Sequence, residues 1–485
     1  MAEMLDKGLQ ALKKVILEFN PNLAGNFEPV QDELVVHDLQ VSGEIPKDLT
    51  GIYMRNGPNP QFPPLLYIWP FDGDGMIHAV YIADGKAQYR NRYVETKALL
   101  KERRAGKTLY GSLARPAPLD PKWADPEDEP VAVKNGSHIC IIRHAGQYLS
   151  LDETNPGYQV TKYLQTIGEW DPGQTGQPIR LSPHTRLDPF SGDLWVVNYD
   201  LNPPYLTLYR IDNKGHIAQR WDIEKSHCSL VHDFVLTEHY AVIFDCPAVF
   251  DINKRLQGEY GVEWQPELGV QIGVMPKAGG KMQWFRTDPF FVFHFANAYE
   301  RQEEIIIDYM RYDKVIVGPF EADDVLPHLY RTIVNLRTGS VKNTQMDDRD
   351  TEFPRIREDR DTVQHRFIYS PTKTPVFPSK WYHALVKYDL EHQQHAVHEF
   401  GRDAQIDEAV FAPASSPTSE DDGYLMLFVY NNETNQSELV ILDAQNMKDE
   451  PLARVHMPRR IPHGLHGSWM SGPWQGPDTP PDGAA

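Results

Sequence analysis

Two histidines near the end of the chain, His463 and His466, are each followed by a glycine in the segment IPHGLHGSW (residues 461–469), just after a basic stretch. Glycine lets a backbone turn sharply or approach another group closely. The segment is therefore expected to form a tight element that presents one imidazole. Taken alone, it would equally fit a surface turn with two solvated histidines.

Three further histidines have neighbours that suggest more than a solvated side chain. His294 ends the apolar run 289–293, His232 opens a second apolar run, and His184 lies in the segment SPHTRLD. Neutral imidazole is a common metal ligand and a common general base, whereas a hydrogen-bonded core histidine or a surface turn is the structural alternative. These three and His466 are far apart in the sequence, unlike the i,i+4 pair of a zinc protease helix. Such separations fit ligands from several strands that converge on the axis of a closed β architecture.

Short apolar runs separated by turn signals fill most of the chain. Residues 194–197 follow a Ser-Gly-Asp turn, and residues 205–211 precede Asn-Lys-Gly. Repeated strand–turn–strand units of this kind predict an all-β architecture, either a propeller or a sandwich assembly. Because glycine and proline are spread throughout and no linker is visible, residues 21–476 are expected to form a single domain.

The first 20 residues follow a different pattern. Apolar side chains recur among lysines at helical spacing, at Leu5, Leu9, Leu12, Ile16 and Phe19. This spacing predicts an amphipathic helix over residues 1–20, which packs on its own protein more often than on lipid, so peripheral membrane contact stays open. No apolar run reaches the ~18 residues that a spanning helix needs, and no signal peptide is recognisable. Residues 477–485 are expected to be a flexible tail.

Composition and charge narrow the classes of partner. The 485 residues include 48 basic and 68 acidic side chains, and the resulting net charge of −20 argues against a nucleic-acid backbone as the partner. Three cysteines without a Cys-x-x-Cys motif (Cys140, Cys228 and Cys246) give neither a disulfide framework nor a thiolate zinc site. A reducing, cytoplasmic location is therefore expected, and no protein partner is indicated.

Nine motifs in sequence order carry a resemblance that spans nearly the whole chain. They are RNGPNP (55–60), FDGDGMIH (71–78), SPHTRLDP (182–189), VHDFVLTEHYAV (231–242), VFHFANAYE (292–300), EFPRI (352–356), EDDGYL (420–425), SELVILDAQ (437–445) and LHGSW (465–469). In these motifs the chain resembles the carotenoid cleavage oxygenase family, whose bacterial members include apocarotenoid- and stilbene-cleaving enzymes. The resemblance implies an all-β fold, a seven-bladed β-propeller with a loop and helix dome over an axial metal site.

The same resemblance implies which residues form the site. It assigns a non-haem Fe(II) to four histidine ligands, which are matched here by His184, His232, His294 and His466. His463 is not expected to be a ligand. Three glutamates behind the ligands are matched by Glu153, Glu352 and Glu408. A metal-bound imidazole needs its other N–H held by an acceptor, although for each glutamate a solvated strand end is the alternative.

The chemistry of four neutral imidazoles is consistent with an oxygenase. They leave the charge of a divalent ion uncompensated and leave positions open for O₂. Imidazole suits Fe, Cu, Zn and Ni alike, so the resemblance rather than the residues names Fe(II), and Zn²⁺ offers no redox chemistry. The implied reaction is oxidative cleavage of an activated C=C bond to two carbonyl products, with no catalytic residue beyond the metal.

The substrate class is the least constrained part of the interpretation. A long polyene needs an apolar tunnel, for which the candidates are Phe62, Leu66, Trp69, Ile139, Phe291 and Phe293. A phenolic stilbene or phenylpropene would need a partner for its hydroxyl group, and Lys134 is the candidate. Ile139 stands where the family often has a threonine near the open iron position. We therefore expect a carotenoid or apocarotenoid substrate, with a phenolic alkene as the alternative.

Other functional classes fit less well. A metal-assisted hydrolase of the propeller lactonase type would need carboxylate-rich, calcium-type ligands. A non-catalytic propeller that binds a partner would need no histidine at its axis. Isomerisation of the substrate, as in a retinoid isomerase, stays open as an alternative to cleavage.

Overall fold

The computed structural model describes residues 20–64, 67–68, 70–113, 115–125, 133–259, 261–315, 325–377 and 379–474. The expected helix over residues 1–20 and tail over residues 477–485 therefore lie outside the described residues, apart from Asn20. Two of the tunnel candidates, Leu66 and Trp69, also lie outside them.

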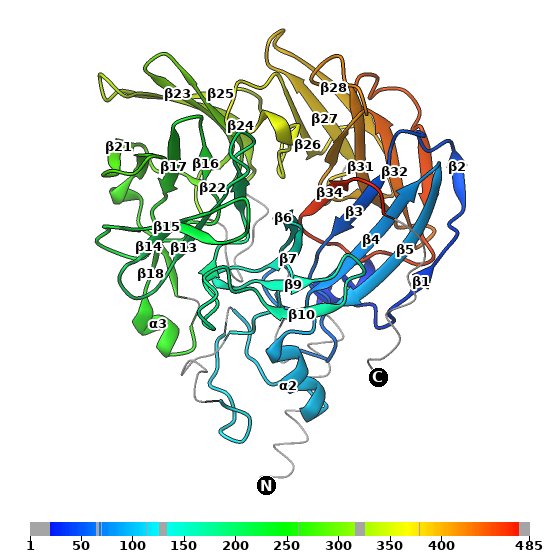
Figure 1. The fold of residues 1–485 in the computed structure, drawn as a ribbon, viewed down its shortest axis with the longest axis horizontal. Coiled ribbons are helices and arrows are strands. Elements are labelled where there is room, and N and C mark those ends of the chain that lie inside the picture. Colours follow the sequence, from blue (N-terminus) through cyan, green and yellow to red (C-terminus); the bar gives the residue numbers. More distant parts are fainter. Residues whose placement is uncertain are drawn as a thin grey trace.

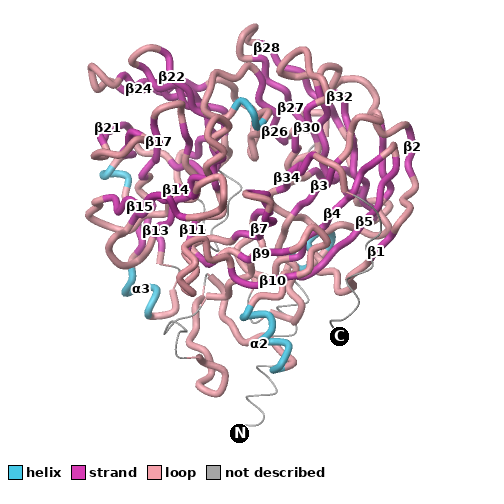
Figure 2. Tube along the Cα trace, in the orientation of Figure 1, coloured by secondary structure: helices cyan, strands magenta, loops and turns pink. Residues whose placement is uncertain are grey.

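Seven antiparallel sheets are arranged around a common centre (Figures 1 and 2), which confirms the expected all-β, seven-bladed propeller. The first sheet contains, in spatial order, β1 (Val35–Val36), β5 (Lys86–Tyr93), β4 (Met76–Ala83), β3 (Gly51–Arg55) and β34 (Gly467–Ser471). The second contains β10 (Thr166–Glu169), β9 (Tyr158–Val160), β7 (Gln147–Leu151) and β6 (Cys140–His144). The third contains β12 (Thr185–Leu187), β13 (Leu194–Tyr199), β14 (Leu206–Ile211) and β15 (Ile217–Ile223).

The remaining four blades follow in chain order. The fourth contains β16 (Val235–Leu236), β17 (Tyr240–Asp245), β20 (Val270–Pro276) and β21 (Gln283–Thr287). The fifth contains β22 (Phe291–Arg301), β23 (Glu304–Tyr312), β24 (His328–Asn335) and β25 (Val341–Gln345), and the sixth β26 (Phe367–Thr372), β27 (Ala384–Asp389) and β28 (Gln394–Glu399). The seventh contains β2 (Val41–Gly43), β33 (Ala453–His456), β32 (Gln436–Asp443), β31 (Gly423–Asn431), β29 (Ala404–Ile406) and β30 (Val410–Pro413).

Strands from the two ends of the chain pair twice and close the ring. β34 pairs antiparallel with β3, and Arg55 lies opposite Gly467. β2 pairs with β33 in the seventh blade, so the early chain also completes the last sheet. Closure leaves no open gap between the first and last blades and fixes β34 beside the axis.

Burial along the strands follows their position within a blade. Every residue of β13 is buried, whereas the outer strand β15 alternates partly buried and exposed residues along most of its length. A strand between two packed blades needs apolar side chains on both faces, while an edge strand shows the period of two of a half-covered sheet. The core therefore lies between adjacent blades, and the axis is lined by the innermost strands.

Short helices and small sheets lie outside the seven blades. The helices are α2 (Lys97–Ala105) and α3 (Ile252–Leu256), with 3₁₀ turns at Pro21–Leu23, Gly25–Phe27, Pro266–Leu268 and Glu358–Arg360. The small sheets pair β8 (Asn155–Pro156) with β11 (Arg180–Leu181), and β18 (Ala248–Phe250) with β19 (Val262–Trp264). Among the described residues, no helix is both long and apolar enough to span a membrane.

Local sequence explains why α2 begins and ends where it does. The Thr96 side chain accepts a hydrogen bond from the Leu99 amide, and Gly106 ends the helix in the left-handed conformation with φ 67°. Both are preferred capping residues, and Arg103 and Arg104 in the last turn complement the helix dipole. These caps fix α2 and with it the buried side chain of Glu102.

Candidate metal centre and substrate cavity

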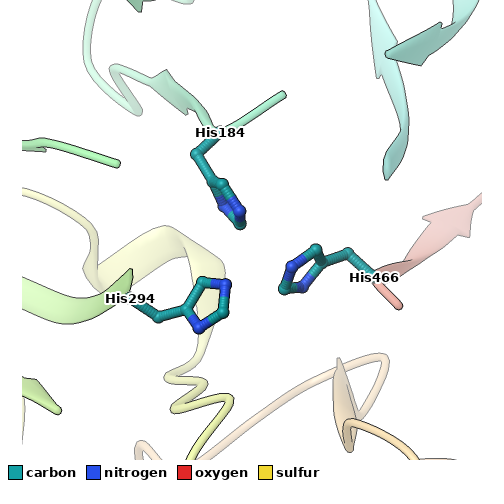
Figure 3. A group of neighbouring side chains, drawn as sticks. All are labelled: His184, His294 and His466. Carbon is teal, nitrogen blue, oxygen red and sulfur yellow. The ribbon is translucent and has the colours of Figure 1, made fainter. Parts of the chain in front are cut away.

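Four imidazoles meet near the axis from four different blades. His184 immediately precedes β12, His232 lies three residues before β16, His294 lies within β22, and His466 immediately precedes β34. The imidazoles of His184, His294 and His466 point toward one another in Figure 3, with ring nitrogens all within 4.8 Å of one another. The Nε2 atoms of His184 and His232 are 3.0 Å apart. The structure thus brings together all four histidines that the resemblance implied.

Three of these imidazoles are held from behind by the three glutamates. The Nδ1 atoms of His232, His294 and His466 lie 2.5, 2.7 and 3.0 Å from carboxylate oxygens. Their partners are Glu153, Glu352 and Glu408, respectively. A carboxylate at Nδ1 fixes the tautomer in which Nδ1 carries the proton and Nε2 offers its lone pair. Among the described residues, no carboxylate holds His184 in this way.

The arrangement of nitrogen atoms fits a bound metal ion. His294 Nε2 is buried and has no hydrogen-bond partner among the described residues, a costly state that a metal ion would relieve. Two nitrogens at about 2.1 Å from one ion and at right angles would lie about 3.0 Å apart, which matches the separation between His184 and His232. With three Nδ1 atoms engaged by glutamates, the inward nitrogens are those free to bind.

Electrostatics favour neutral imidazoles at two of the four positions. Burial, followed by the neighbouring His232, His466 and His294, holds the pKa of His184 well below its usual value. Burial likewise lowers the pKa of His466. Burial alone would raise the pKa of Glu408, but Arg355 and His466 lower it to about 2, so this carboxylate stays charged. At His294 the effect of burial is outweighed by Glu352, which raises the pKa of that imidazole.

A buried ion pair from the start of the chain holds the segment that carries His466. The Arg55 guanidinium lies 3.0 Å from an Asp407 carboxylate oxygen and donates a hydrogen bond of 2.7 Å to the Pro462 carbonyl. A Cβ atom at Gly464 would lie only 1.6 Å from that guanidinium, so residue 464 must be glycine. Packing against Arg55, rather than a sharp turn, therefore explains this glycine of the HGLHG motif. The sequence did not indicate this role of Arg55.

His463 lies outside the cluster. Its Nδ1 is 2.8 Å from Asp407, and its ring contacts those of Phe27 and Trp381. His463, the first of the two HG histidines, therefore helps to hold this segment in place.

Phe353 is a site residue that the sequence did not single out. Its ring centroid lies 5.1 Å from that of His294 and 5.5 Å from that of His466. Its φ of 55° is unusual for a non-glycine residue, a conformation that costs about 1–3 kcal/mol. Its amide donates to the Glu352 carboxylate, which helps to hold this geometry. The strained backbone places an apolar wall directly beside two of the imidazoles.

A cavity of about 1950 Å³ reaches the centre from the side covered by the helices and small sheets. Its lining includes His232, His294 and His466. Phe293, next to His294 in the sequence, and Ile139, whose carbonyl accepts a hydrogen bond from the His466 amide, also line it. Helices α2 and α3 also contribute to its wall, as expected for a dome. Drug-sized ligands usually occupy about 300–1,000 Å³, so this cavity has room for a long molecule.

Lys134 lines the cavity but is not a solvated strand end. Its ammonium lies 2.5 Å from Asp74 and 2.5 Å from Glu102. Although burial opposes the charged form, both carboxylates together raise the pKa of Lys134. The lysine therefore stays charged and already has two ionic partners, which lie far from it in the sequence.

Two tunnel candidates were wrong. Phe291 is fully buried in the core and lies behind Phe293, with ring centroids 4.7 Å apart. A register irregularity between Val292 and Phe295 breaks the regular alternation of β22, so side-chain direction could not be read from spacing. Phe62 is half-buried and does not line the cavity, and the amide of its neighbour Gln61 donates a hydrogen bond of 3.0 Å to Asp74. The same loop contributes Ile68, Pro70 and Phe71 to the lining instead.

Comparisons with known proteins agree with this geometry. The family model described as retinal pigment epithelial membrane protein (RPE65) matches residues 27–471. A carotenoid cleavage oxygenase of Mycobacterium tuberculosis is 33% identical, over 93% of this chain and 97% of its own length. The structure of Pseudomonas brassicacearum lignostilbene dioxygenase is similar with a TM-score of 0.85 and 26% identity, over 94% of this chain and 99% of that chain. A variant of Synechocystis apocarotenoid oxygenase gives a TM-score of 0.83 and 27% identity, over 92% of this chain and 98% of that chain.

Replacing any of the four clustered histidines by alanine should abolish activity and weaken metal binding, because each change removes one of the four nitrogen ligands. His463→Ala is the matched control and should keep one metal ion per chain. Metal content and activity of the purified variants, measured together with circular dichroism to verify folding, test both statements. Loss of metal from His463→Ala with retention in His466→Ala would show that the wrong histidine of the HG pair has been chosen.

Replacing Glu153, Glu352 or Glu408 by glutamine should leave the fold intact but weaken metal affinity or activity by roughly 10–100-fold, as removal of an outer partner generally does. The control is Glu300→Gln, because Glu300 holds the exposed His239 at 3.0 Å in a similar pair away from the centre. Competition titrations with a chelator give the affinities. Equal affinity in all four variants would contradict the role assigned to the three glutamates.

Proposed function

This chain belongs to the RPE65/carotenoid oxygenase family and is an oxygenase-type enzyme, and on that premise we propose that it uses Fe(II) and O₂ to cleave a C=C bond of a carotenoid or apocarotenoid. The observation that carries the proposal is the set of four converging imidazoles, His184, His232, His294 and His466, three of them held by glutamates. Iron supplies the redox chemistry with O₂ that no side chain of the site can supply.

The residues of the chain position the alkene and exclude water. Phe293 and Phe353 line the cavity beside the imidazoles, and Phe293 contacts His232 with ring centroids 5.5 Å apart. Apolar walls at this point place a double bond, rather than a polar group, next to the metal. They also keep bulk water away from the reacting carbons. No side chain is required to donate or accept a proton when a double bond is replaced by two carbonyl groups.

Cavity size and the state of Lys134 support a polyene over a compact phenol. A cavity of about 1950 Å³ exceeds what a stilbene would fill. A phenolic hydroxyl that approaches Lys134 would have to compete with Asp74 and Glu102 for the ammonium. Displacing a buried carboxylate from its cation leaves an uncompensated charge, which is strongly unfavourable.

Cleavage of a phenolic stilbene is the second candidate. In its favour, Lys134 reaches the cavity wall, and the lignostilbene dioxygenase structure matches this fold with a TM-score of 0.85. The two candidates share the same metal centre and differ only in what the cavity holds.

A substrate panel distinguishes the two candidates. The iron-loaded enzyme, offered an apocarotenal, a bicyclic carotenoid and 4-hydroxystilbene under air, should release aldehydes from one or both of the polyenes only, as identified by mass spectrometry. Lys134→Arg, which keeps the charge next to Asp74 and Glu102, should retain polyene cleavage. Cleavage of the stilbene alone, together with its loss in Lys134→Met, would instead establish the phenolic substrate.

Exposed apolar side chains at the cavity mouth support peripheral contact with a membrane that holds the substrate. Ile252, Leu256, Leu326 and Trp381 line the cavity, and each is at least 37% exposed. The basic side chains of Arg255 and Lys380 line the same region. Apolar residues next to basic ones are typical of surfaces that insert shallowly into anionic bilayers.

Leu256→Ser should therefore reduce co-flotation with vesicles that contain anionic phospholipids. Phe190→Ser is the matched control, because Phe190 is 69% exposed but does not line the cavity. Equal flotation of both variants and the unchanged protein would remove the cavity mouth as a membrane contact.

A further inference from the structure

A second, smaller cavity of about 450 Å³ reaches the same imidazoles from the opposite side. Its walls come from the innermost strands β6, β12, β22 and β34 and from residues 353–361, and we call it the axial channel. Of these strands, β6, β22 and β34 are labelled around the centre of the ring in Figure 1. His294 and His466 line both cavities, whereas His184 lines only the axial channel and His232 only the larger cavity. The four imidazoles thus stand between two separate spaces.

Burial changes along the axial channel. At its inner end, His294 and His466 are buried, while Leu187, Glu358 and Ser471 are exposed. Ser471 ends β34, five residues after His466, so the strand carries the wall from the centre to the surface. The channel therefore connects solvent with the imidazoles without passing through the larger cavity.

Charged side chains are concentrated along the wall of this small channel. Among the described residues that line the channel, five are acidic and three are arginines. The acids are Asp233, Glu358, Asp359, Asp361 and Glu408, and the arginines are Arg143, Arg186 and Arg355. Asp233 is paired with Arg186 at 2.6 Å, and Glu358 with Arg355 at 3.0 Å. Asp359 is offset by Arg357 at 2.7 Å, so the acids along the channel still exceed their cationic partners by one. Narrow clefts of one sign raise the local concentration of the opposite ion.

Asp361 is the carboxylate with the weakest compensation. It accepts a hydrogen bond of 3.1 Å from the Thr362 amide. Burial raises its pKa to about 6, despite the opposing effect of Arg186. A cation that passes through the channel would supply the positive charge that this position lacks.

We propose that the axial channel is the path by which a hydrated divalent cation reaches the four histidines, while the larger cavity admits the alkene. The inference rests on the proposed function, in which these histidines hold a metal. In the larger cavity a hydrated ion would have to pass Phe293, which packs beside His232 and does not line the channel, at a high desolvation cost. On the axial side it meets carboxylates on the way to His184, which lines only this channel, and to His294, whose buried Nε2 has no hydrogen-bond partner among the described residues.

Charge changes at Ser471 test the path without touching the centre. Five extended residues place Ser471 about 16 Å from His466, which exceeds the Debye length of about 8 Å at physiological ionic strength. With the metal-free full-length protein and Co²⁺ as the probe, Ser471→Lys should slow metal uptake and Ser471→Glu should accelerate it, each by about 3-fold at physiological ionic strength. Ser471→Gln should match the unchanged protein. Because only the path is altered, release of Co²⁺ into a chelator should change by the same factor, and the equilibrium affinity should not change.

Two more variants distinguish which of the two cavities the ion passes through. Asp361→Asn, which removes one charge from the axial channel, should slow uptake by about 3-fold. Glu259→Gln removes one charge from an exposed residue that lines the larger cavity and should leave the rate unchanged. Uptake that is slowed by Glu259→Gln, or that is insensitive to all Ser471 variants, would overturn the axial path. A wild-type protein that binds no Co²⁺ at all would instead refute the metal centre of the proposed function.

Discussion

Pairing of the last strand with an early one is the interaction on which the site depends. β34 forms its ladder with β3, and His466 immediately precedes β34. The ladder therefore closes the ring of blades and sets the position of one imidazole at the same time. Arg55, the last residue of β3, extends this coupling by holding the Pro462 carbonyl and Asp407. Any loosening of the closure would move His466 relative to the other three histidines, which come from blades that are already complete.

Charge is distributed around the centre in layers. The inner layer is four imidazoles, and burial favours the neutral form of His184 and His466. The next layer contains Glu153, Glu352 and Glu408, of which Glu408 also faces Arg355 at 3.6 Å. A divalent ion in the centre would thus be compensated by carboxylates that do not touch it. This arrangement leaves inner positions for O₂ and still keeps a charged ion stable in a protein interior.

The sequence predicted those features that a motif carries and missed those that depend on partners distant in the chain. The propeller and the meeting of the four histidines followed from nine ordered motifs, and the three glutamates from the family resemblance that these motifs carry. The pairing of Lys134 with Asp74 and Glu102 did not, because neither partner lies near it in the sequence and no periodicity links the three. Phe291 was placed in the tunnel because it lies close to His294 in the sequence, but β22 has a register irregularity at this point, and closeness in sequence did not give the direction of the side chain. Similarly, the strained conformation of Phe353 leaves no signal in the residue type.

His184 differs from its three companions because no carboxylate holds its outer nitrogen among the described residues. Its ring contacts those of His232, His294 and His466, with centroid separations of 4.5, 4.8 and 4.5 Å. Rotation of this ring breaks no charge-assisted hydrogen bond, whereas rotation of any of the others does. The four bonds between these imidazoles and an ion would therefore differ in how readily they break. Exchange of the ion would begin with dissociation of His184, the one ligand that borders only the axial channel.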